Sequence, residues 1–385
     1  MRKVAIIGVG CTKVDDHWGK SLRNLFADAA LKALEDAGVE RVDSLYVGNM
    51  SSGFLQAQEH LGALMADSIG MPGIPAVKVE AACASGGAAF HEGFKAVVSG
   101  LADLVLVGGV EKMTDTLTPH VSSAMIMAED QEYTAYTGVT FVGLNALIHR
   151  LYMETFKAKP EEIAMFPVVD HQHAVNNPFA QFQSTITVDR VLKSPFVADP
   201  LHILECAGIG DGAAAAILCP LEKAKDFTDT PIEVAASTVA TDTLSLHERD
   251  NLLTFAASQR AANSAYEMAK IRQSDVDVLE VHDAFSILGP LSLEDLGFVK
   301  KGEGAKFTME GQTAIGGKLP TNTFGGLKAR GHPVGATGVY QIVELTWQLR
   351  GEAGKNQVNG AEIGMAQNIG GIGATVTVHI LRRVK

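Results

Sequence analysis

Two segments of the chain place a reactive side chain beside small residues, directly before an apolar helical run. His332 lies in GGLKARGHPVGATG (residues 325–338), where glycine and proline shape a tight loop ahead of the helical spacing of VGATGVYQIVELTWQL. Cys83 lies in EAACASGGAAFHEGFKAVVSG (residues 80–100), at the end of a predicted strand. A thiol nucleophile and an imidazole base are the groups that nucleophilic catalysis needs, so we predict an enzyme. The alternative roles are a buried core thiol and a helix-capping histidine.

Length and composition indicate an ordinary globular protein with a large core. The 385 residues are 46% hydrophobic and 20% charged, which favours two domain-sized units. A net charge of −12 and only 6% aromatic residues argue against a nucleic-acid partner. Lysine and arginine form no anion-binding cluster, so a phosphate-bearing ligand would be held partly by another chain.

The sequence contains few signs of a targeting segment, a disulfide framework or a cofactor-binding motif. We see neither a secretory signal nor a membrane-spanning run, and expect a cytoplasmic protein with no membrane partner. Cys11, Cys206 and Cys219 are predicted to be free core thiols. GVGCTK at residues 8–13 has only part of a dinucleotide fingerprint, so no permanently bound cofactor is expected.

The order of predicted elements occurs twice. SLRNLFADAALKALEDAGVERVDSLYVGN near the start and ASQRAANSAYEMAKIRQSDVDVLEVHDAF near residues 258–285 each predict a helix followed by a strand. A Gly-rich turn, a helix and a strand then follow in both halves. Such a duplication predicts two related, mostly parallel sheets with helices packed on them, and equivalent loops that meet at one pseudo-symmetric cleft. Residues from about 113 to 200 fit neither half and predict an inserted cap domain.

Several motifs in this order resemble the thiolase superfamily over nearly the whole chain. The sterol-carrier-protein-type and archaeal-type branches are the most similar. The motifs are NNPFAQFQ (176–183), DPLHILECAGIGDGAAAA (199–216), HDAF (282–285) and AQNIGGIGA (366–374). The resemblance implies an α/β fold with layered α-β-α-β-α architecture. Its expected parts are an N-terminal half (1–112 and 201–225), a cap or loop domain (113–200) and a C-terminal half (226–385).

The resemblance also assigns roles to residues. Cys83 would be the acylated nucleophile, and we expect its thiolate to be favoured by the helix N-terminus and a nearby imidazole. His332 would take the Cys83 proton, and His282 would form an oxyanion hole with His332. Backbone N–H groups of Cys83 and of the Gly370–Gly373 loop, at Gly371 and Gly373, would form a second oxyanion hole. The further site-lining residues are expected to be Met125, Phe285, Gly331 and Asn368.

The chain departs from its relatives at the group that moves the α-proton. Asn368 lies where two-cysteine thiolases keep a second cysteine, and Ala284 lies where sterol-carrier-type enzymes have one. The base is therefore unassigned, with His282 and His332 as the remaining titratable candidates. Asp283 is expected to pair with backbone. His171 and His173 have metal-ligand spacing, but a structural role is favoured and no metal is predicted.

The expected activity is that of an acetyl-CoA C-acetyltransferase, with ping-pong condensation of two acetyl-CoA to acetoacetyl-CoA and CoA. Coenzyme A thioesters would be its substrates. The resemblance further implies HMG-CoA synthase and a small zinc-ribbon/OB-fold (DUF35-type) protein as partners in the mevalonate route. A homodimer or a dimer of dimers is expected, paired through the strand ADLVLVGGVE.

Three other functions remain open from the sequence. A decarboxylating Cys-His-His condensing enzyme would need no α-proton base. A degradative thiolase of longer or branched 3-ketoacyl-CoA would use the same chemistry in reverse. A non-catalytic acyl carrier would have no need of Cys83, His282 and His332 together.

Overall fold

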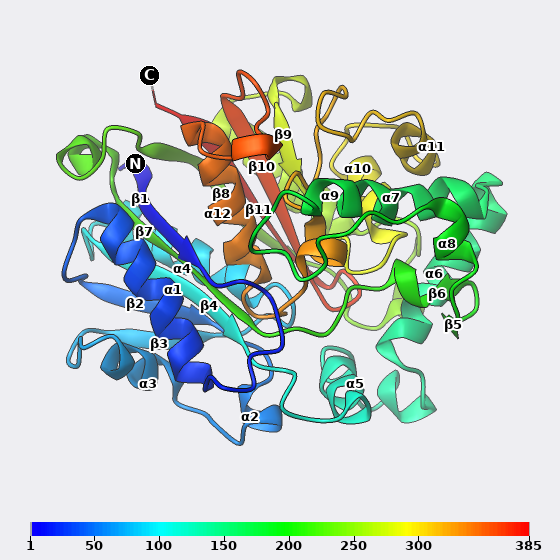
Figure 1. The fold of residues 1–385 in the computed structure, drawn as a ribbon, viewed down its shortest axis with the longest axis horizontal. Coiled ribbons are helices and arrows are strands. Elements are labelled where there is room, and N and C mark those ends of the chain that lie inside the picture. The colour runs from blue at the N-terminus through cyan, green and yellow to red at the C-terminus, as the bar shows by residue number, and fades with distance from the viewer. Residues whose placement is uncertain (1, 385) are drawn as a thin grey trace.

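The computed structural model describes residues 2–384, which form a layered α/β fold around one large sheet (Figure 1). Nine strands lie in the order β3-β2-β4-β7-β1-β8-β11-β10-β9, and β5 and β6 form a separate pair. The strands are β1 (Val4–Cys11), β2 (Ser44–Gly48), β3 (Ala76–Val79), β4 (Val105–Glu111), β5 (Phe196–Ala198), β6 (Leu201–His202), β7 (Gly212–Pro220), β8 (Ile232–Thr241), β9 (Val278–Glu280), β10 (Ile363–Gly370) and β11 (Thr375–Arg383).

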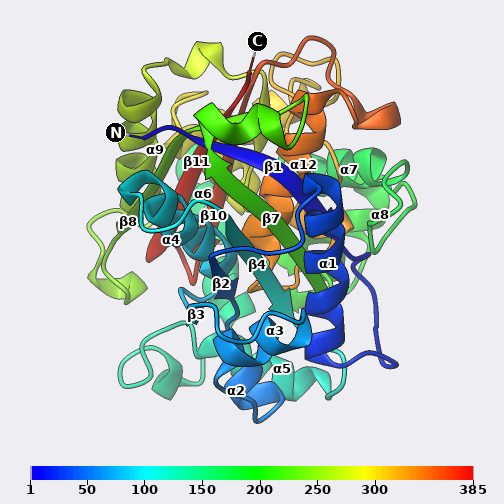
Figure 2. The same cartoon turned by 90° about the vertical axis from the view of Figure 1, so that its left-hand side faces the viewer.

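The helices divide the hydrophobic interior into three main cores. Helices α4 and α12 share one core with strands from both halves of the sheet, α1 shares a second with β1, β2, β4 and β7 (Figure 2), and α9 shares a third with the C-terminal strands. The predicted α-β-α-β-α layering is therefore confirmed. The helices are α1 (Leu22–Ala37), α2 (Ser52–Leu55), α3 (Leu61–Ser68), α4 (Ser85–Ser99), α5 (Thr118–Ile126), α6 (Phe141–Phe156), α7 (Pro160–Ala174), α8 (Val188–Leu192), α9 (Ala256–Ala269), α10 (Leu288–Asp295), α11 (Gly304–Met309) and α12 (Thr337–Arg350).

The duplication is visible in the strand pairing. In the N-terminal half β2 pairs in parallel with β3 and β4, while β7 runs antiparallel to both β4 and β1. In the C-terminal half β9 pairs in parallel with β10, and β11 runs antiparallel to β10 and β8. Antiparallel pairing of β1 with β8 joins the halves into one sheet. Within each half only the last strand, β7 or β11, runs against the others, so each half is mostly parallel as predicted. The two halves nevertheless form one continuous sheet instead of two.

The strand expected to pair two subunits lies inside the sheet. ADLVLVGGVE contains β4, whose two edges are occupied by β2 and β7. No backbone edge of β4 is left for another chain, so the prediction that subunits pair through this strand was wrong. The free edge on that side of the sheet belongs to β3, where the side chain of Val77 is 50% exposed.

The segment of residues 113–200 lies beside the sheet and contains α5, α6, α7 and α8. Its strand β5 pairs with β6 outside the nine-stranded sheet. Helix α6 and helix α7 contribute Tyr152 and Phe166 to the core that α9 shares with the C-terminal strands. Within residues 2–384, no helix has both the length and the apolar character that crossing a membrane requires.

Candidate active site

A tight turn between β3 and α4 presents Cys83. Ala82 adopts the left-handed conformation, with φ of 51°. The Ser85 hydroxyl donates to Ala82 O at 2.6 Å, and Ser85 Oγ accepts from the Ala81 N–H at 2.9 Å. The turn is thereby fixed just before α4 begins at Ser85, and the side chain of Cys83 is only 3% exposed.

The two histidines come from adjacent segments of the C-terminal half. His282 follows β9, and His332 lies between a helical turn (Gly326–Arg330) and α12. Asp283 accepts hydrogen bonds from the N–H groups of Leu327 and Lys328 at 2.7 and 3.0 Å, which ties the segment of His282 to the turn before His332. The expected pairing of Asp283 with backbone is confirmed.

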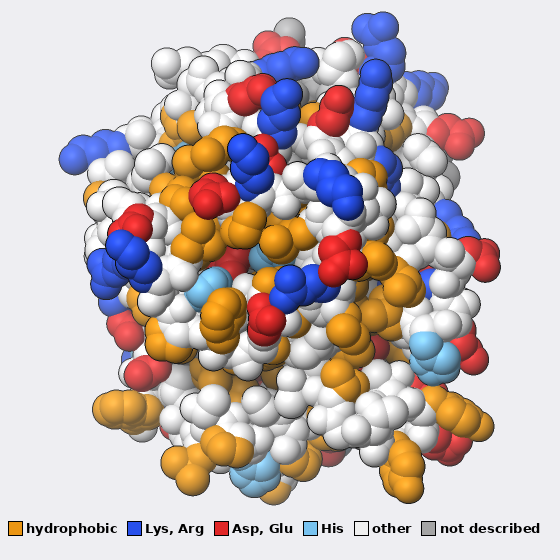
Figure 3. Space-filling model, turned by 90° about the vertical axis from the view of Figure 1, so that its right-hand side faces the viewer, with side chains coloured by type: hydrophobic (Ala, Val, Ile, Leu, Met, Phe, Trp, Pro, Cys, Tyr) orange, Lys and Arg blue, Asp and Glu red, His pale blue; other side chains and the backbone are white. Residues whose placement is uncertain are grey.

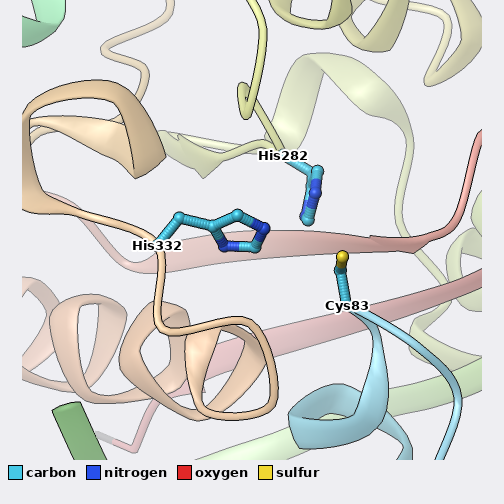
Figure 4. Close-up of side chains that lie close together, drawn as sticks. All are labelled: Cys83, His282 and His332. Carbon is cyan, nitrogen blue, oxygen red and sulfur yellow. The ribbon is translucent and has the colours of Figure 1, made fainter. Parts of the chain in front are cut away.

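The thiol and both imidazoles meet in one buried cluster (Figure 4). Cys83 Sγ and a ring nitrogen of each histidine lie within 4.8 Å of one another. The two imidazole rings are perpendicular, at 89°, with centroids 5.0 Å apart. Loops from the two halves of the chain therefore converge on one site, as the duplication predicted.

The hydrogen bonds of His332 define which of its nitrogens is free. Nδ1 lies 2.7 Å from Thr337 Oγ1, and the Thr337 hydroxyl donates its proton to Pro333 O at 3.2 Å. The hydroxyl therefore accepts from the imidazole, so Nδ1 carries the proton and Nε2 keeps its lone pair. Burial, with His282 and Arg330 nearby, lowers the pKa of His332 well below its usual value, and the ring stays neutral.

His282 has the opposite tautomer. Its Nδ1 faces two donors, Asn368 Nδ2 at 3.1 Å and the Ile369 N–H at 3.3 Å, so Nδ1 accepts and Nε2 carries the proton. Burial and, secondarily, Arg330 lower the pKa of His282 to about 3. Asn368 also donates to Cys83 O at 3.0 Å. Asn368 thus links the nucleophile turn to His282 and sets its tautomer.

The thiol of Cys83 is not a preformed thiolate. Burial raises its pKa to about 12, and the negative charges of Glu111 and Glu129 act in the same direction. A hydrogen bond from the Gly371 N–H lowers the pKa, but it does not offset burial. The expectation that the helix N-terminus and a nearby imidazole favour the thiolate was wrong, because burial dominates the pKa of this thiol and lowers the pKa of both imidazoles. Ionisation of Cys83 must therefore accompany its attack on a substrate.

The glycine-rich loop between β10 and β11 passes close to Cys83. An added Cβ on Gly370 would lie 2.3 Å from Ala81 O, so a side chain would push the loop away from the nucleophile turn. Gly371, at φ of 58°, directs its N–H to the Cys83 sulfur. Gly373 donates its N–H to Gly370 O at 3.3 Å, so that group is engaged within the turn.

A cavity of about 480 Å³ opens beside Cys83 and His332. Of the expected lining residues, Met125 and Phe285 form part of its wall. Gly331 packs elsewhere, since an added Cβ would lie 2.4 Å from Val14. The wall is mostly apolar, and a hollow bordered by hydrophobic side chains is visible in the space-filling view (Figure 3).

A lysine, Lys328, also lines this cavity. It is 4% exposed, and its Nζ lies 5.2 Å from the centroid of the Phe182 ring. Burial lowers the pKa of this lysine, while the nearby Cys206, Asp170 and Asp283 act in the opposite direction. A largely apolar cavity wall with one amino group suits a largely apolar ligand that carries an oxygen acceptor.

His171 and His173 lie in α7 and bind backbone. His171 Nδ1 pairs with Ser184 O at 2.7 Å, and His173 Nδ1 pairs with Asn322 O at 3.0 Å. His173 Nε2 accepts from the Ile315 N–H at 3.2 Å. These bonds fit the structural role that the sequence favoured.

Sequence reasoning missed Glu111, the last residue of β4. Its carboxylate is fully buried and accepts five hydrogen bonds. One oxygen accepts from the N–H groups of Met50 and Gly335, at 3.0 and 2.9 Å, and the other from Ser51 and Asn49. Glu111 therefore joins the loop after β2 to the loop that carries His332. A charged residue that ends an otherwise apolar strand was the available signal.

We expect Glu111→Ala to lower the free energy of unfolding by about 3–5 kcal/mol, because it leaves several buried donors without an acceptor. Urea denaturation followed by circular dichroism measures this. The matched control is Glu35→Ala on the exposed face of α1, for which we expect a change below about 0.5 kcal/mol. Equal stability of the two variants would contradict the structural role of Glu111.

Comparison with known families agrees with this architecture. The family model "Thiolase, N-terminal domain" matches residues 4–222, and "Thiolase C-terminal domain-like" matches residues 238–383. The chain is a member of the thiolase family. The predicted superfamily and the predicted class of acyltransferase are thus confirmed.

The relatives of this thiolase include archaeal and sterol-carrier proteins, as the motifs indicated. A Methanothermobacter thermautotrophicus protein named acetyl-CoA acetyltransferase is 52% identical over 385 residues. The alignment covers 100% of this chain and 100% of that protein. A Methanocaldococcus jannaschii protein of the same name is 45% identical, with 99% of each chain covered. Human sterol carrier protein 2 is 34% identical, over 99% of this chain and 72% of that protein.

Solved structures share the thiolase fold at low sequence identity. A chain of the Ltp2-ChsH2(DUF35) aldolase superposes with a TM-score of 0.85 at 24% identity, covering 99% of this chain and 97% of that one. Human mitochondrial 3-ketoacyl-CoA thiolase gives a TM-score of 0.76 at 20% identity, covering 100% and 99%.

Proposed function

We propose that this thiolase is an acetyl-CoA C-acetyltransferase that condenses two acetyl-CoA to acetoacetyl-CoA and CoA. The observation that carries the proposal is the buried cluster of Cys83, His282 and His332 at one cavity, with the two histidines in opposite tautomers. The two archaeal relatives named acetyl-CoA acetyltransferase support the choice of substrate.

In the first half-reaction, Cys83 attacks the thioester carbonyl of acetyl-CoA. The free Nε2 of His332 takes the thiol proton as the new C–S bond forms, because the buried thiol does not ionise alone. We expect the backbone N–H groups of Cys83 and Gly371, both of which lower the pKa of the Cys83 thiol, to stabilise the oxyanion. The bond to the CoA sulfur then breaks, and the imidazolium of His332 returns the proton to the leaving thiolate.

In the second half-reaction, the enolate of another acetyl-CoA attacks acetyl-Cys83. The proton on Nε2 of His282 makes this imidazole a hydrogen-bond donor, which suits the thioester oxygen as it gains charge. Because one CoA leaves before the second acetyl-CoA reacts, the kinetics are ping-pong. The substrates are coenzyme A thioesters, and the mechanism needs no permanent cofactor or metal.

The wider setting follows as part of the same proposal. Residues 113–200 act as the cap between the N-terminal half (1–112 and 201–225) and the C-terminal half (226–385), and Met125 from the cap reaches the cavity. We propose a cytoplasmic homodimer or dimer of dimers that feeds HMG-CoA synthase. The structural neighbour with a DUF35 partner supports a zinc-ribbon/OB-fold partner that completes the CoA site of this acidic chain.

The test is thiolysis, the downhill direction, with purified protein, acetoacetyl-CoA and free CoA. We expect loss of the acetoacetyl-CoA absorbance and formation of two acetyl-CoA per substrate consumed. If acetoacetyl-CoA persists while malonyl-CoA is decarboxylated and condensed, the chain is instead a decarboxylating condensing enzyme. Faster cleavage of long or branched 3-ketoacyl-CoA would point to a degradative thiolase.

A further inference from the structure

The proposed condensation needs a base for the α-proton, and neither histidine is well suited to this role. His282 Nδ1 is occupied by two donors and its Nε2 is protonated, so this ring has no lone pair to give. The Nε2 of His332 is free again once Cys83 is acetylated, but burial lowers the pKa of this ring well below its usual value, which makes it a weak base for a C–H proton. A stronger base beside Cys83 would remove the α-proton more readily.

The negative charges of two carboxylates, Glu111 and Glu129, raise the pKa of the Cys83 thiol. The two carboxylates differ in whether an oxygen is left without a hydrogen-bond donor. Both oxygens of Glu111 are bonded to donors in the surrounding loops. Glu129 is also buried, at 3% exposed, but only its Oε1 is engaged. Among the described residues, no hydrogen-bond donor reaches Glu129 Oε2. Because an unpaired buried carboxylate oxygen is costly, it points to a ligand or a proton as its partner.

Glu129 lies directly against the loop that contacts the nucleophile. Its Oε1 accepts from the Ile372 N–H at 2.8 Å, and an added Cβ on Gly371 would lie 2.8 Å from the same oxygen. The neighbouring N–H, that of Gly371, points to the sulfur of Cys83. Met125, four residues earlier, lines the cavity. The carboxylate thus reaches the same loop as the sulfur, from the side of the cap.

We propose that Glu129 is the base that removes the α-proton of the second acetyl-CoA. The inference rests on the proposed function. Its carboxylate takes one proton from the methyl carbon of acetyl-CoA, and the C–H electron pair becomes the enolate. The enolate carbon bonds to the carbonyl carbon of acetyl-Cys83, the bond to Cys83 sulfur breaks, and the thiolate leaves. The proton on Glu129 then passes to the Cys83 thiolate, which restores the starting thiol and carboxylate; in thiolysis the same transfers run in reverse and Glu129 returns a proton to the departing enolate.

The acid strength of Glu129 suits this task. Burial raises its pKa to about 7, against the opposing effects of the Ile372 N–H and of Arg249. A base works best when its pKa lies near the working pH, since it then accepts a proton readily while about half of it is still unprotonated. Arg249 donates to Ile372 O at 2.6 Å, and its positive charge lowers the pKa of this carboxyl group.

The test compares Glu129→Gln with the unchanged protein in two separate reactions. The glutamine oxygen still accepts from the Ile372 N–H, so the loop keeps its anchor. The first readout is the rate at which acetyl-CoA acetylates Cys83, followed by mass spectrometry. The second is deuterium uptake from D₂O into the methyl group of acetyl-CoA, together with thiolysis of acetoacetyl-CoA. The matched control is Glu132→Gln, an exposed glutamate three residues away.

We expect Glu129→Gln to acetylate Cys83 within about twofold of the normal rate and to lose deuterium uptake and thiolysis by about 100-fold or more. If Glu129→Gln slows acetylation of Cys83, deuterium uptake and thiolysis by the same factor, Glu129 only anchors the loop. This result would overturn the proposal. Unchanged deuterium uptake would overturn it too. If the unchanged protein never acetylates Cys83, the proposed function itself fails.

Discussion

Cys83→Ala is expected to reduce thiolysis of acetoacetyl-CoA by about 10⁴-fold or more, because it removes the thiol that lies against both histidines. The histidines beside it are neutral and held by Thr337 and Asn368. Alanine fills nearly the same space, so the fold should persist. The rate is measured from the loss of acetoacetyl-CoA absorbance.

The matched control for this substitution is Cys219→Ala, which removes a buried thiol from β7. We expect near-normal thiolysis from it. Comparable activity in the Cys83 and Cys219 variants would contradict covalent catalysis at Cys83, as would an acetyl group retained by the Cys83→Ala protein.

His332→Ala is expected to slow acetylation of Cys83 by about 10²–10⁴-fold at neutral pH and to make it strongly pH-dependent. Without the base, only the thiolate attacks. Because the Cys83 pKa is raised to about 12, the thiolate fraction rises about tenfold per pH unit below that value. The unchanged protein should show a nearly flat rate from pH 7 to 9, since the lowered pKa of His332 leaves its Nε2 unprotonated throughout.

Stopped samples analysed by mass spectrometry give these acetylation rates across pH. His247→Ala, at an exposed position far along the chain, is the control and should follow the unchanged protein. A flat pH profile in His332→Ala would mean that another group takes the proton from Cys83.

The sequence was informative where chemistry depends on residue type and local turn shape. Cys83, His282 and His332 lie in motifs that fix both the family and the loops, and the structure brings them together. Met125 and Phe285, which the sequence suggested as site-lining residues, lie in the wall of the cavity. These residues follow short-range patterns, so no long-range contact had to be known to find them.

The features of the site and sheet that the sequence did not predict depend on contacts between distant segments of the chain. The free lone pair of His332 follows from Thr337, but the protonated Nε2 of His282 depends on Asn368, 86 positions away. Desolvation makes Cys83 a neutral thiol, and no motif reports burial. Glu111 and Glu129 differ only in how many donors the fold brings to each. The direction of β7 and β11, and hence the interior place of β4, is likewise set by tertiary pairing.

The most direct test of the account is to mix the purified protein with acetyl-CoA, quench, digest and measure the mass of the peptide that contains Cys83. We predict a mass increase of one acetyl group on that peptide, reversed on addition of CoA, and none on the peptides that carry Cys11, Cys206 or Cys219. An unmodified Cys83 peptide, in protein that still turns over acetoacetyl-CoA and CoA, would contradict the covalent mechanism.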